Sequence, residues 1–295
     1  MTSGAEKTAE AVLDGIDLRG KVIVVTGASG GLGMETSRAL AARGAQVVMT
    51  ARDPSKAADA AAAVDANAHA ATLDLGSLDG VRAGAASLLR DWPHVDVLIN
   101  NAGVMATPEQ RTADGFELQL GTNHLGHFLL TALLAPALDD QARIVNVTSL
   151  GHLISAMHWD DPHYLTRRYD KWEAYGQSKT ANILFTRGLA DRGRTAYAVH
   201  PGRIATDLYR HLGAEETAAA EQRSREQAPS KSIAQGAATT VWAATADGIP
   251  SGSYLADCAV ADAAPHATDP AEVARFWTWS EEQVGYATPD ARPAQ

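Results

Sequence analysis

Cysteine is almost absent from this chain. Cys258 is the single cysteine in 295 residues, so neither an intrachain disulfide nor a thiolate metal cluster can form. Long apolar runs are also missing: the most apolar stretch, Phe128–Leu138, is too short to cross a bilayer and contains Pro136. Residues 1–19 hold several acidic side chains and no long apolar run, which is unlike a signal peptide. These absences favour a cytoplasmic protein without a membrane partner.

Basic residues are also few relative to acidic ones. The 25 lysines and arginines are outnumbered by 35 aspartates and glutamates, which gives a formal charge of -10 at pH 7. A surface that binds nucleic acid or an anionic membrane needs clustered Lys and Arg. We therefore expect no nucleic-acid partner. The composition, 45% hydrophobic and 20% charged, is that of an ordinary globular protein.

The histidines do not form a set of metal ligands. His124 and His127 fall on neighbouring turns of one predicted helix, but no carboxylate lies at ligand spacing from them. His152 and His158 lie in a polar stretch close to Asp160. Zinc sites in proteins need three or four converging ligands. Packing and loop roles are favoured for these histidines, and no metal is expected.

The chain does contain a regular alternation of short apolar runs with amphipathic stretches. This alternation predicts an α/β fold: a single domain with a doubly wound, Rossmann-type parallel sheet of about seven strands and helices on both faces. The predicted strands are Lys21–Thr26, Gln46–Ala51, His69–Asp74, Val95–Asn100, Ala142–Thr148, Thr195–His200 and Gly252–Ala256. The predicted helices are Leu32–Arg43, Ser55–Ala66, Ser77–Asp91, Ala113–Leu134, Trp172–Arg192 and Asp269–Val284.

The two ends and two internal segments fall outside the alternation. We predict an N-terminal extension at 1–17, one domain at 18–285 and a tail at 286–295, with the first dozen residues and the tail mobile. Gly151–Lys171 is polar and is expected to form a long loop, and Ile204–Ser230 contains a charged helical stretch. Long segments inside a compact domain that do not belong to its regular strands and helices are usually functional or disordered.

A glycine-rich loop follows the first predicted strand. In TGASGGLG, Gly27, Gly31 and Gly33 precede a predicted helix. Glycines there let the backbone turn sharply and approach a phosphate, while the helix N-terminus offers free N–H groups. A tight turn alone would also explain glycines. Their place between the first strand and the first helix favours a dinucleotide site.

Further motifs follow in a fixed order along the chain. A Tyr-x-x-x-Lys pair such as Tyr175 and Lys179 in YGQSK arises often by chance, so it decides nothing alone. Together, the motifs resemble the short-chain dehydrogenase/reductase family from about Leu18 to Ala256, and most closely its carbonyl reductase and retinol dehydrogenase-like branches. The motifs are TGASGGLG, NNAG at 100–103, TNHLGHF around Asn123, VNVTS ending at Ser149, YGQSK, and HPGRIAT at His200–Thr206.

The resemblance implies catalytic roles for Asn123, Ser149, Tyr175 and Lys179. A phenol ordinarily ionises near pH 10, so an ammonium one helical turn away would favour its ionised form. By the resemblance, Tyr175 handles the proton, Lys179 supports it and bonds the nicotinamide ribose, and Ser149 stabilises charge on the substrate oxygen. Asn123 corresponds to a residue that holds a proton-relay water. The gap from Ser149 to Tyr175 is longer than the family commonly shows, and the predicted loop between them accounts for it.

Cofactor choice is argued from charge. In the family, an acidic residue near the end of the second strand accepts bonds from the ribose of NAD. Here Ala51 fills that position and Arg52 follows, which suits the 2′-phosphate of NADP, although Arg52 could instead be an ordinary solvated residue. We expect NADP, with NADPH preferred over NADH. The residues expected to contact it are Gly27, Ser29, Gly30, Gly31, Leu32, Gly33, Arg52, Asp74, Leu75, Asn101, Ala102, Gly103, Tyr175, Lys179, Pro201, Gly202, Ile204 and Thr206.

The substrate is expected to be a hydrophobic ketone or aldehyde, or the matching alcohol. The two segments outside the alternation should close its pocket, and their candidate lining residues are largely apolar. Arg167, Arg168 and Arg203 are taken as solvated, so no cluster is aimed at an anion. The candidate lining residues are Leu153, Ile154, Met157, Trp159, Tyr164, Ile204, Leu208, Tyr209 and Leu212.

Other readings stay open at this point. A dinucleotide sensor without turnover would be expected to lack the Tyr or the Lys, and both are present. An epimerase or dehydratase of the extended branch would carry a larger C-terminal domain than the residues after Thr206 supply. Family members commonly pair through the helices predicted at Ala113–Leu134 and Trp172–Arg192, so a homodimer or homotetramer is also expected.

Overall fold

The computed structural model describes residues 4–204, 213, 216 and 230–287. Its central feature is an eight-stranded sheet with the strand order β3-β2-β1-β4-β5-β6-β7-β8. All neighbouring pairs are parallel except β7 with β8. The strands are β1 (Val22–Thr26), β2 (Gln46–Ala51), β3 (Ala68–Thr72), β4 (Val97–Asn100), β5 (Arg143–Val147), β6 (Thr195–His200), β7 (Tyr254–Ala256) and β8 (Ala259–Ala261).

The α/β fold and the doubly wound sheet are confirmed, with one strand more than expected. β8 is joined to β7 by a two-residue turn at Asp257 and Cys258, whose φ angles are 53° and 55°. Positive φ at both central residues is the signature of a tight hairpin turn that matches the twist of the strands. β8 was missed because its residues are largely exposed and form no buried apolar run.

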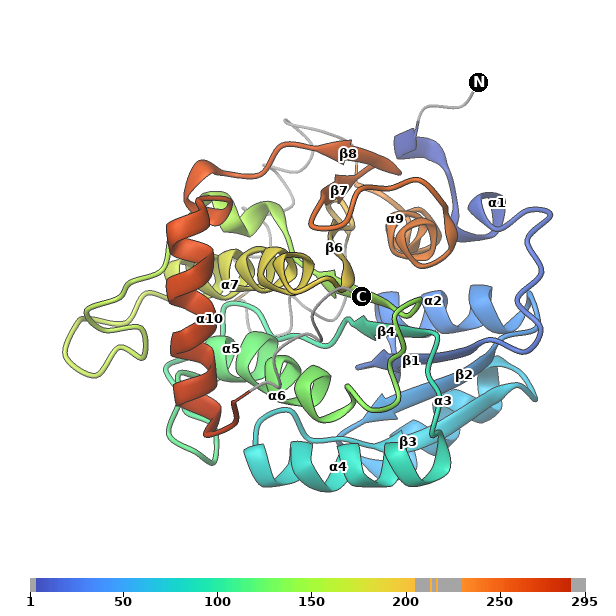
Figure 1. Cartoon of the computed structure of the whole chain (residues 1–295), viewed down its shortest axis with the longest axis horizontal. Helices are drawn as coiled ribbons and strands as arrows, with labels where there is room; N and C mark the ends of the chain where they lie inside the picture. Colours follow the sequence, from blue (N-terminus) through green and yellow to red (C-terminus); the bar gives the residue numbers. More distant parts are fainter. Residues whose placement is uncertain (1–3, 205–212, 214–215, 217–229, 288–295) are drawn as a thin grey trace.

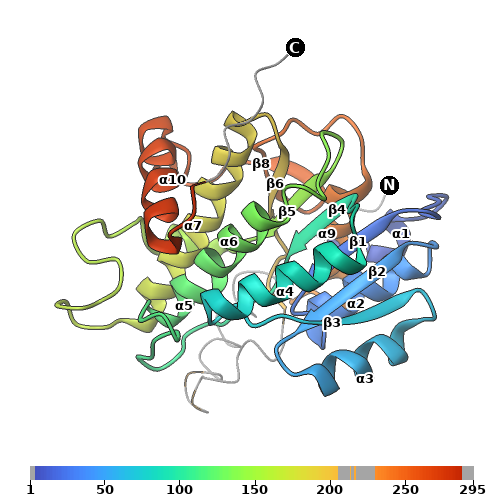
Figure 2. The same ribbon diagram turned by 60° about the horizontal axis from the view of Figure 1, so that its bottom comes forward.

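The helices cover both faces of the sheet (Figure 1). Side chains of opposite parity along each strand enter two separate cores: Val24 and Leu98 face one side, while Ile23 and Ile99 face the other. α4, α6, α7 and α10 pack on the first side and lie next to one another in Figure 2. The helices are α1 (Ala9–Val12), α2 (Gly31–Ala41), α3 (Pro54–Val64), α4 (Leu78–Asp91), α5 (Leu118–Leu120), α6 (Gly126–Leu133), α7 (Lys171–Asp191), α9 (Ile233–Thr245) and α10 (Pro270–Val284).

The long helix predicted at Ala113–Leu134 is wrong in its first part. Gly115 has a φ of 87° and belongs to a turn in which the Thr112 N–H bonds the Phe116 carbonyl. Helix begins only at Leu118, and α5 passes into α6 through a π-helical turn, Gly121–Leu125. Such turns often occur at functional sites.

α9 was missed because its apolar face is made mostly of alanine and threonine. Its start carries a recognisable signal: Ser232 and Gln235 form a reciprocal capping box. Directly before this helix, Lys231 pairs with Ile204 in a parallel bridge, and the Lys231 N–H donates to the Arg203 carbonyl over 2.9 Å. The charged stretch predicted to be helical lies outside the described residues, apart from Gly213 and Glu216.

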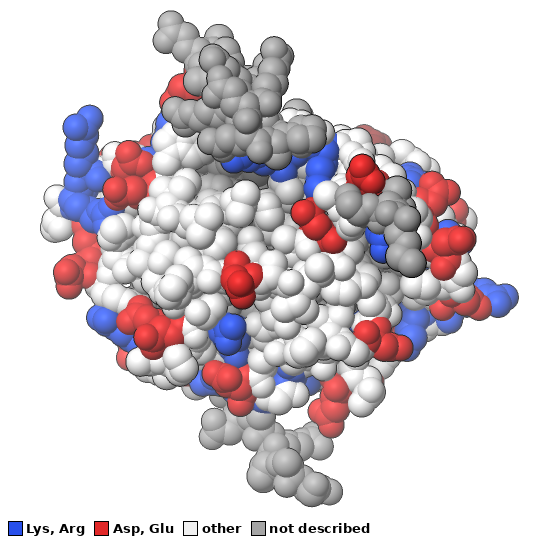
Figure 3. Space-filling model, turned by 90° about the horizontal axis from the view of Figure 1, so that it is seen from above, with Lys and Arg blue, Asp and Glu red and all other residues white. Residues whose placement is uncertain are grey.

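The N-terminal segment is anchored to the body through α1, contrary to the mobility expected for the first dozen residues. Ala9 and Leu13 are fully buried in the core shared with α2 and α9. On the face that carries this segment and β8, most acidic and basic side chains lie toward the margin, and single acidic side chains lie within it (Figure 3). Among the described residues of that face, neither sign gathers into a patch. The end of the tail, 288–295, lies outside the described residues.

The helix predicted at Asp269–Val284 is confirmed as α10, and its aromatic side chains pack onto the body. α10 lies against α7, and Phe276 and Trp277 are buried beside Phe128 of α6. The apolar part of the helix predicted at Ala113–Leu134, one of the two helices through which pairing is expected, is therefore buried within one chain. A homodimer or homotetramer stays a prediction, and it would need surfaces other than this stretch.

Candidate active site

A cleft of about 1520 Å³ opens at the carboxyl ends of the central strands. This is the place where open α/β sheets bind ligands, at the point where the strand order reverses between β1 and β4. The cleft brings together the predicted site residues, except that Asn123 lies behind its wall and Thr206 lies outside the described residues. From the predicted set, the lining residues are Gly27, Ser29, Gly30, Gly31, Leu32, Gly33, Arg52, Asp74, Leu75, Asn101, Ala102, Gly103, Ser149, Tyr175, Lys179, Pro201, Gly202 and Ile204.

The glycine loop is shaped by close backbone contacts. Gly27 has a φ of 63°, and a Cβ there would lie 2.7 Å from the Cα of Ala102. A Cβ on Gly33 would lie 2.5 Å from the Gly27 carbonyl oxygen and 2.6 Å from Nδ2 of Asn101. α2 begins beside the cleft with Gly30 as its N-cap, and no side chain caps it. The first N–H groups of α2 and this side-chain-free cradle suit a pyrophosphate.

The floor of the cleft, formed by the segment after β4, is held by hydrogen bonds to Thr26 at the end of β1. Its Oγ1 accepts hydrogen bonds from the N–H groups of Asn101 and Ala102, over 2.9 and 3.0 Å. The Asn101 side chain donates back to the Thr26 carbonyl over 2.8 Å. These bonds fix the segment after β4 directly against the glycine loop.

Two cations lie at the end of β2. Arg52 and Lys56 both line the cleft, together with Asp53. Oδ1 of Asp53 is occupied as the N-cap of α3, where it accepts from the N–H groups of Ser55 and Lys56 over 2.9 and 3.3 Å. Lys56 was missed from sequence, although it lies four residues after Arg52 and one turn into α3.

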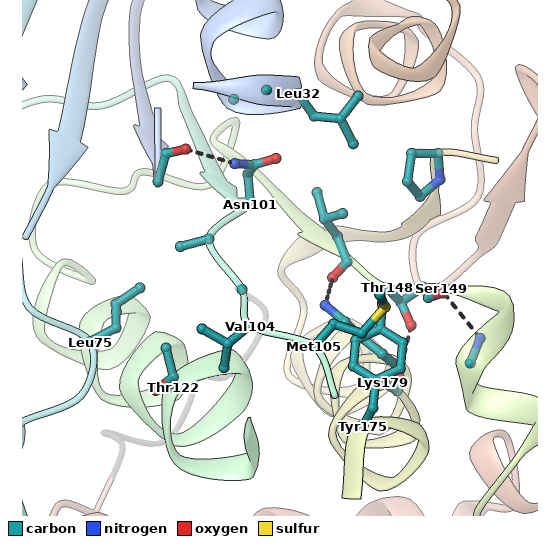
Figure 4. Close-up of a pocket in the computed structure, with 18 of the residues that line it drawn as sticks. Leu32, Leu75, Asn101, Val104, Met105, Thr122, Thr148, Ser149, Tyr175 and Lys179 are labelled. Atoms are coloured by element: carbon teal, nitrogen blue, oxygen red, sulfur yellow. Dashed lines mark hydrogen bonds between the residues drawn. The ribbon is translucent and has the colours of Figure 1, made fainter. Parts of the chain in front are cut away.

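Tyr175 and Lys179 lie one turn apart on α7 and face the same cleft (Figure 4). The Lys179 Nζ lies 5.6 Å from the centre of the Tyr175 ring and donates to the Val147 carbonyl over 3.2 Å. Its side chain is buried, and burial lowers the pKa of Lys179 to about 8 because an ammonium loses hydration there. The sequence-predicted pair is therefore brought together at one wall.

Ser149 stands directly after β5 and caps a short 3-10 turn, Leu150–Leu153. Its Oγ accepts the Gly151 N–H over 3.0 Å, so its hydroxyl proton stays available to donate into the cleft. Thr148, the alternative hydroxyl, donates to the Lys179 carbonyl over 2.8 Å and is thereby committed to the backbone of α7. Ser149 is the better placed of the two for a ligand.

Asn123 is fully buried in the π-helical turn, and its side chain holds the cleft floor from the side away from the cleft. Its Oδ1 accepts from the Val104 N–H over 2.8 Å, and its Nδ2 donates to the Val104 carbonyl over 2.9 Å. The same Nδ2 bonds Oγ of Ser178, the residue before Lys179, over 3.0 Å. The side chain thus joins the cleft floor to α7.

His124 and His127 are both buried in the structure. Burial lowers the pKa of His124 to about 3 and that of His127 to about 4, so both rings are neutral at pH 7. His124 lies among Phe128, Phe185 and Phe276 and bonds Oγ of Ser280 in α10 over 3.0 Å. Within the described residues, no group of three or more acidic, histidine or cysteine side chains could hold a metal ion.

The loop expected to close the substrate pocket divides into two parts. Leu153 and Ile154 line the mouth of the cleft with 61% and 52% of their surface exposed. Met157, Trp159 and Tyr164 do not line the cleft: Met157 is buried in the main core. Trp159 bonds a carboxylate oxygen of Glu272 over 2.8 Å, and the buried Tyr164 ring carries the guanidinium of Arg167 at 4.2 Å.

Other lining residues were not predicted from sequence. Met105 and Trp172 form a small apolar cluster with Ala106 and the Tyr175 ring. Ala106 has a φ of 50°, and its N–H is held by Oε1 of Gln119 over 2.9 Å. No sequence pattern predicts this strained turn, which places Met105 beside Tyr175 (Figure 4). From the second predicted segment, Leu208, Tyr209 and Leu212 lie outside the described residues.

Comparison with known proteins agrees with this geometry. The family described as short chain dehydrogenase matches residues 21–217. Human retinol dehydrogenase 12 is 41% identical over 284 residues, covering 92% of this chain and 88% of that protein. The chain belongs to the short-chain dehydrogenase/reductase family. Its relatives place it in the retinol dehydrogenase-like branch, as the motifs predicted.

Solved structures of the family have the same fold. An uncharacterized protein from Mycobacterium paratuberculosis has a TM-score of 0.78 at 36% identity, covering 98% of this chain and 100% of that one. RhlG of Pseudomonas aeruginosa, solved as an active-site complex with NADP, has a TM-score of 0.65 at 27% identity, covering 81% of this chain and 96% of that one. Family members are oxidoreductases that use nicotinamide dinucleotides. No helix among the described residues of this chain is both long and apolar enough to span a membrane.

Proposed function

We propose that this short-chain dehydrogenase/reductase transfers a hydride between NADP(H) and a hydrophobic ketone or aldehyde, or the corresponding alcohol. The observation that carries the proposal is the convergence of Ser149, Tyr175 and Lys179 in the cleft that also contains the glycine loop. The nicotinamide cofactor, when bound, supplies or accepts the hydride. The chain's own residues then have to bind both reactants and handle one proton.

Proton handling is assigned to the wall formed by α7 and β5. In reduction, the Tyr175 phenol gives its proton to the substrate oxygen, and Ser149 donates a hydrogen bond that stabilises the developing charge there. The buried Lys179 ammonium favours the ionised phenol that remains. Asn123 holds Val104 and Ser178 in register with this wall. The water-holding role expected for Asn123 stays a prediction.

NADP preference is supported by the charges at the end of β2. Arg52 and Lys56 both line the cleft, and no acidic side chain occupies position 51. A 2′-phosphate dianion there would gain from a guanidinium and an ammonium. One oxygen of the nearby Asp53 carboxylate is already engaged at the start of α3. The NADP complex of RhlG is a precedent within the family.

An apolar substrate is supported by the walls around Tyr175. Met105, Trp172, Leu153 and Ile154 supply these walls. Of the three arginines considered for an anion, Arg203 alone lines the cleft, whereas Arg167, which is paired with Glu173, and Arg168 do not line it. Human retinol dehydrogenase 12 is named for an apolar primary alcohol, which fits the same class.

The experiment that tests the proposal is a panel of ketones and aldehydes graded by size and charge. Each is assayed with NADPH and with NADH, and nicotinamide absorbance reports turnover. We expect the highest kcat/KM with NADPH and large uncharged carbonyl compounds. Preference for an anionic substrate would contradict the apolar pocket, and tight NADP binding without any turnover would favour a sensor.

A further inference from the structure

His127 lies at the back of the site, on the first turn of α6, and is 2% exposed. Its two ring nitrogens contact two parts of the site that are far apart in sequence. Nδ1 lies 2.9 Å from the main-chain carbonyl oxygen of Asn123, and Nε2 lies 2.8 Å from Oγ1 of Thr26. Neither contact belongs to the roles proposed above.

The direction of each bond follows from which atoms can donate. A carbonyl oxygen only accepts, so Nδ1 carries the proton. Burial keeps the ring neutral, because it lowers the pKa of His127 to about 4, and the charge of the nearby Lys179 acts in the same direction. Nε2 is then an acceptor, and the Thr26 hydroxyl donates to it. The Ile99 carbonyl, at 3.4 Å, is the weaker acceptor for that proton.

This assignment leaves both lone pairs of Thr26 Oγ1 free to accept. They are used by the N–H groups of Asn101 and Ala102, which form the floor of the cleft. One directed chain of hydrogen bonds therefore runs from the floor through Thr26 and His127 to Asn123. The Asn123 side chain continues it to Val104 and to Ser178 on α7.

We infer that His127 is a positioning residue of the active site: one ring nitrogen holds the Thr26 hydroxyl and the other holds the Asn123 carbonyl. Through Nε2 it orients the Thr26 hydroxyl, and hence the floor against which the dinucleotide lies. Through Nδ1 it holds the main chain of Asn123, and hence the register of the π-helical turn against α7. The inference rests on the proposed dinucleotide site, but its tests do not all require turnover.

Two substitutions separate the two bonds. The side-chain amide of asparagine reaches the place of Nδ1, so His127→Asn keeps a donor for the Asn123 carbonyl and loses the acceptor for Thr26. The longer glutamine places its amide near Nε2, so His127→Gln keeps the acceptor for Thr26 and loses the donor. His127→Phe fills the same space and loses both.

We expect the two variants to fail differently. His127→Asn should raise the NADP Kd about tenfold, measured by calorimetry without substrate, and lower kcat by less than about threefold. His127→Gln should change Kd by less than about threefold and lower kcat about tenfold at saturating NADPH. His127→Phe should do both. Parallel losses in Kd, kcat and melting temperature for Asn and Gln would overturn the inference, as would no loss in either.

The matched control is His124, which is equally buried and lies three residues earlier. Its bonded partner is Ser280 of α10, away from the floor, so His124→Gln should lower the melting temperature and leave the NADP Kd and kcat within about twofold of wild type. A measurement on the wild-type protein tests the inference even if the variants do not fold.

Nitrogen-15 NMR of the ligand-free wild-type protein should show His127 neutral, with its proton on Nδ1, from pH 6 to 8. A proton on Nε2, or titration in that range, would overturn the inference, whereas absence of turnover on every substrate would overturn only the proposed function.

Discussion

The two halves of the cleft are built in different ways. The half formed by β1, β2 and β4 consists of short connections whose backbone contacts define the surface, such as Gly27 against Ala102 and Asn101 against Thr26. The half beyond β5 is bordered by the long loop Gly151–Lys171, and only part of the apolar side chains of this loop face the cleft. A surface made of backbone tolerates little change, whereas a surface made of loop side chains can be altered one residue at a time.

The largest expected effect is at the wall between the two halves. Tyr175→Phe removes the phenolic proton donor while keeping the ring against Met105, so turnover should fall about a thousandfold. The NADP Kd, measured separately by calorimetry, should change by less than about threefold, because the hydroxyl serves chemistry more than binding. Turnover close to wild type would show that another group handles the proton.

A methyl group on the backbone-built half should be costly. In Gly33→Ala, the Cβ would lie 2.5 Å from a backbone oxygen that cannot move aside independently. Relieving such an overlap costs about 1–3 kcal/mol, so the NADP Kd should rise roughly tenfold to a hundredfold. Gly193→Ala is the control: it adds a methyl at a φ of 75° in open space after α7 and should leave Kd unchanged. Equal effects from both variants would point to general destabilisation.

Charge reversal at the edge of the same half should select between cofactors. Arg52→Asp replaces an attraction for the 2′-phosphate by a repulsion, so the NADP Kd should rise tenfold or more, roughly the worth of one charge-assisted bond, and NAD binding should change little. Arg168→Asp makes the same change of charge on an exposed loop outside the cleft and should affect neither. Wild-type protein that uses NADH more efficiently than NADPH would end the argument for NADP.

Acid should lower the folding stability of the region where His124 packs against α10, behind the cleft. The pKa of His124 is about 3 in the folded chain and about 6.5 when unfolded, so the unfolded state binds the extra proton in between. Its contribution to stability is therefore fully present above pH 6.5 and falls as the pH drops toward 3. Between pH 7.5 and pH 5 the loss should be on the order of 1–2 kcal/mol. In His124→Phe, denaturant unfolding at both pH values should show a correspondingly smaller difference.

The smallest effect is expected at the mouth of the loop-built half. Leu153→Ser with Ile154→Ser removes apolar surface that is already half exposed, so KM for an apolar ketone should rise only about threefold to tenfold. Trp159→Phe, a change in the same loop but outside the cleft, should leave KM unaltered. A larger effect from Trp159 would mean that the loop acts as one rigid unit.

The same contrast explains what could be predicted from sequence. β2 and β6 were predicted to the residue, because buried parallel strands read as continuous apolar runs. The glycine loop and the Tyr175–Lys179 pair follow from local spacing. The position of Trp159 depends on its bond to Glu272 of α10, more than a hundred residues away in the chain, and no local pattern encodes such a contact. From sequence, His127 was treated as a packing residue; its two hydrogen-bond partners, Thr26 and Asn123, could be identified only from the fold.

The bridge between Ile204 and Lys231 has a consequence for how such a protein can diversify. The folded body already holds these two residues side by side, whatever lies between them. The entropy of closing a connection grows only with the logarithm of its length, about 0.6 kcal/mol per doubling. Insertions or deletions between the two residues would therefore cost the fold little. The length of that stretch can therefore change in evolution at little cost to the stability of the sheet.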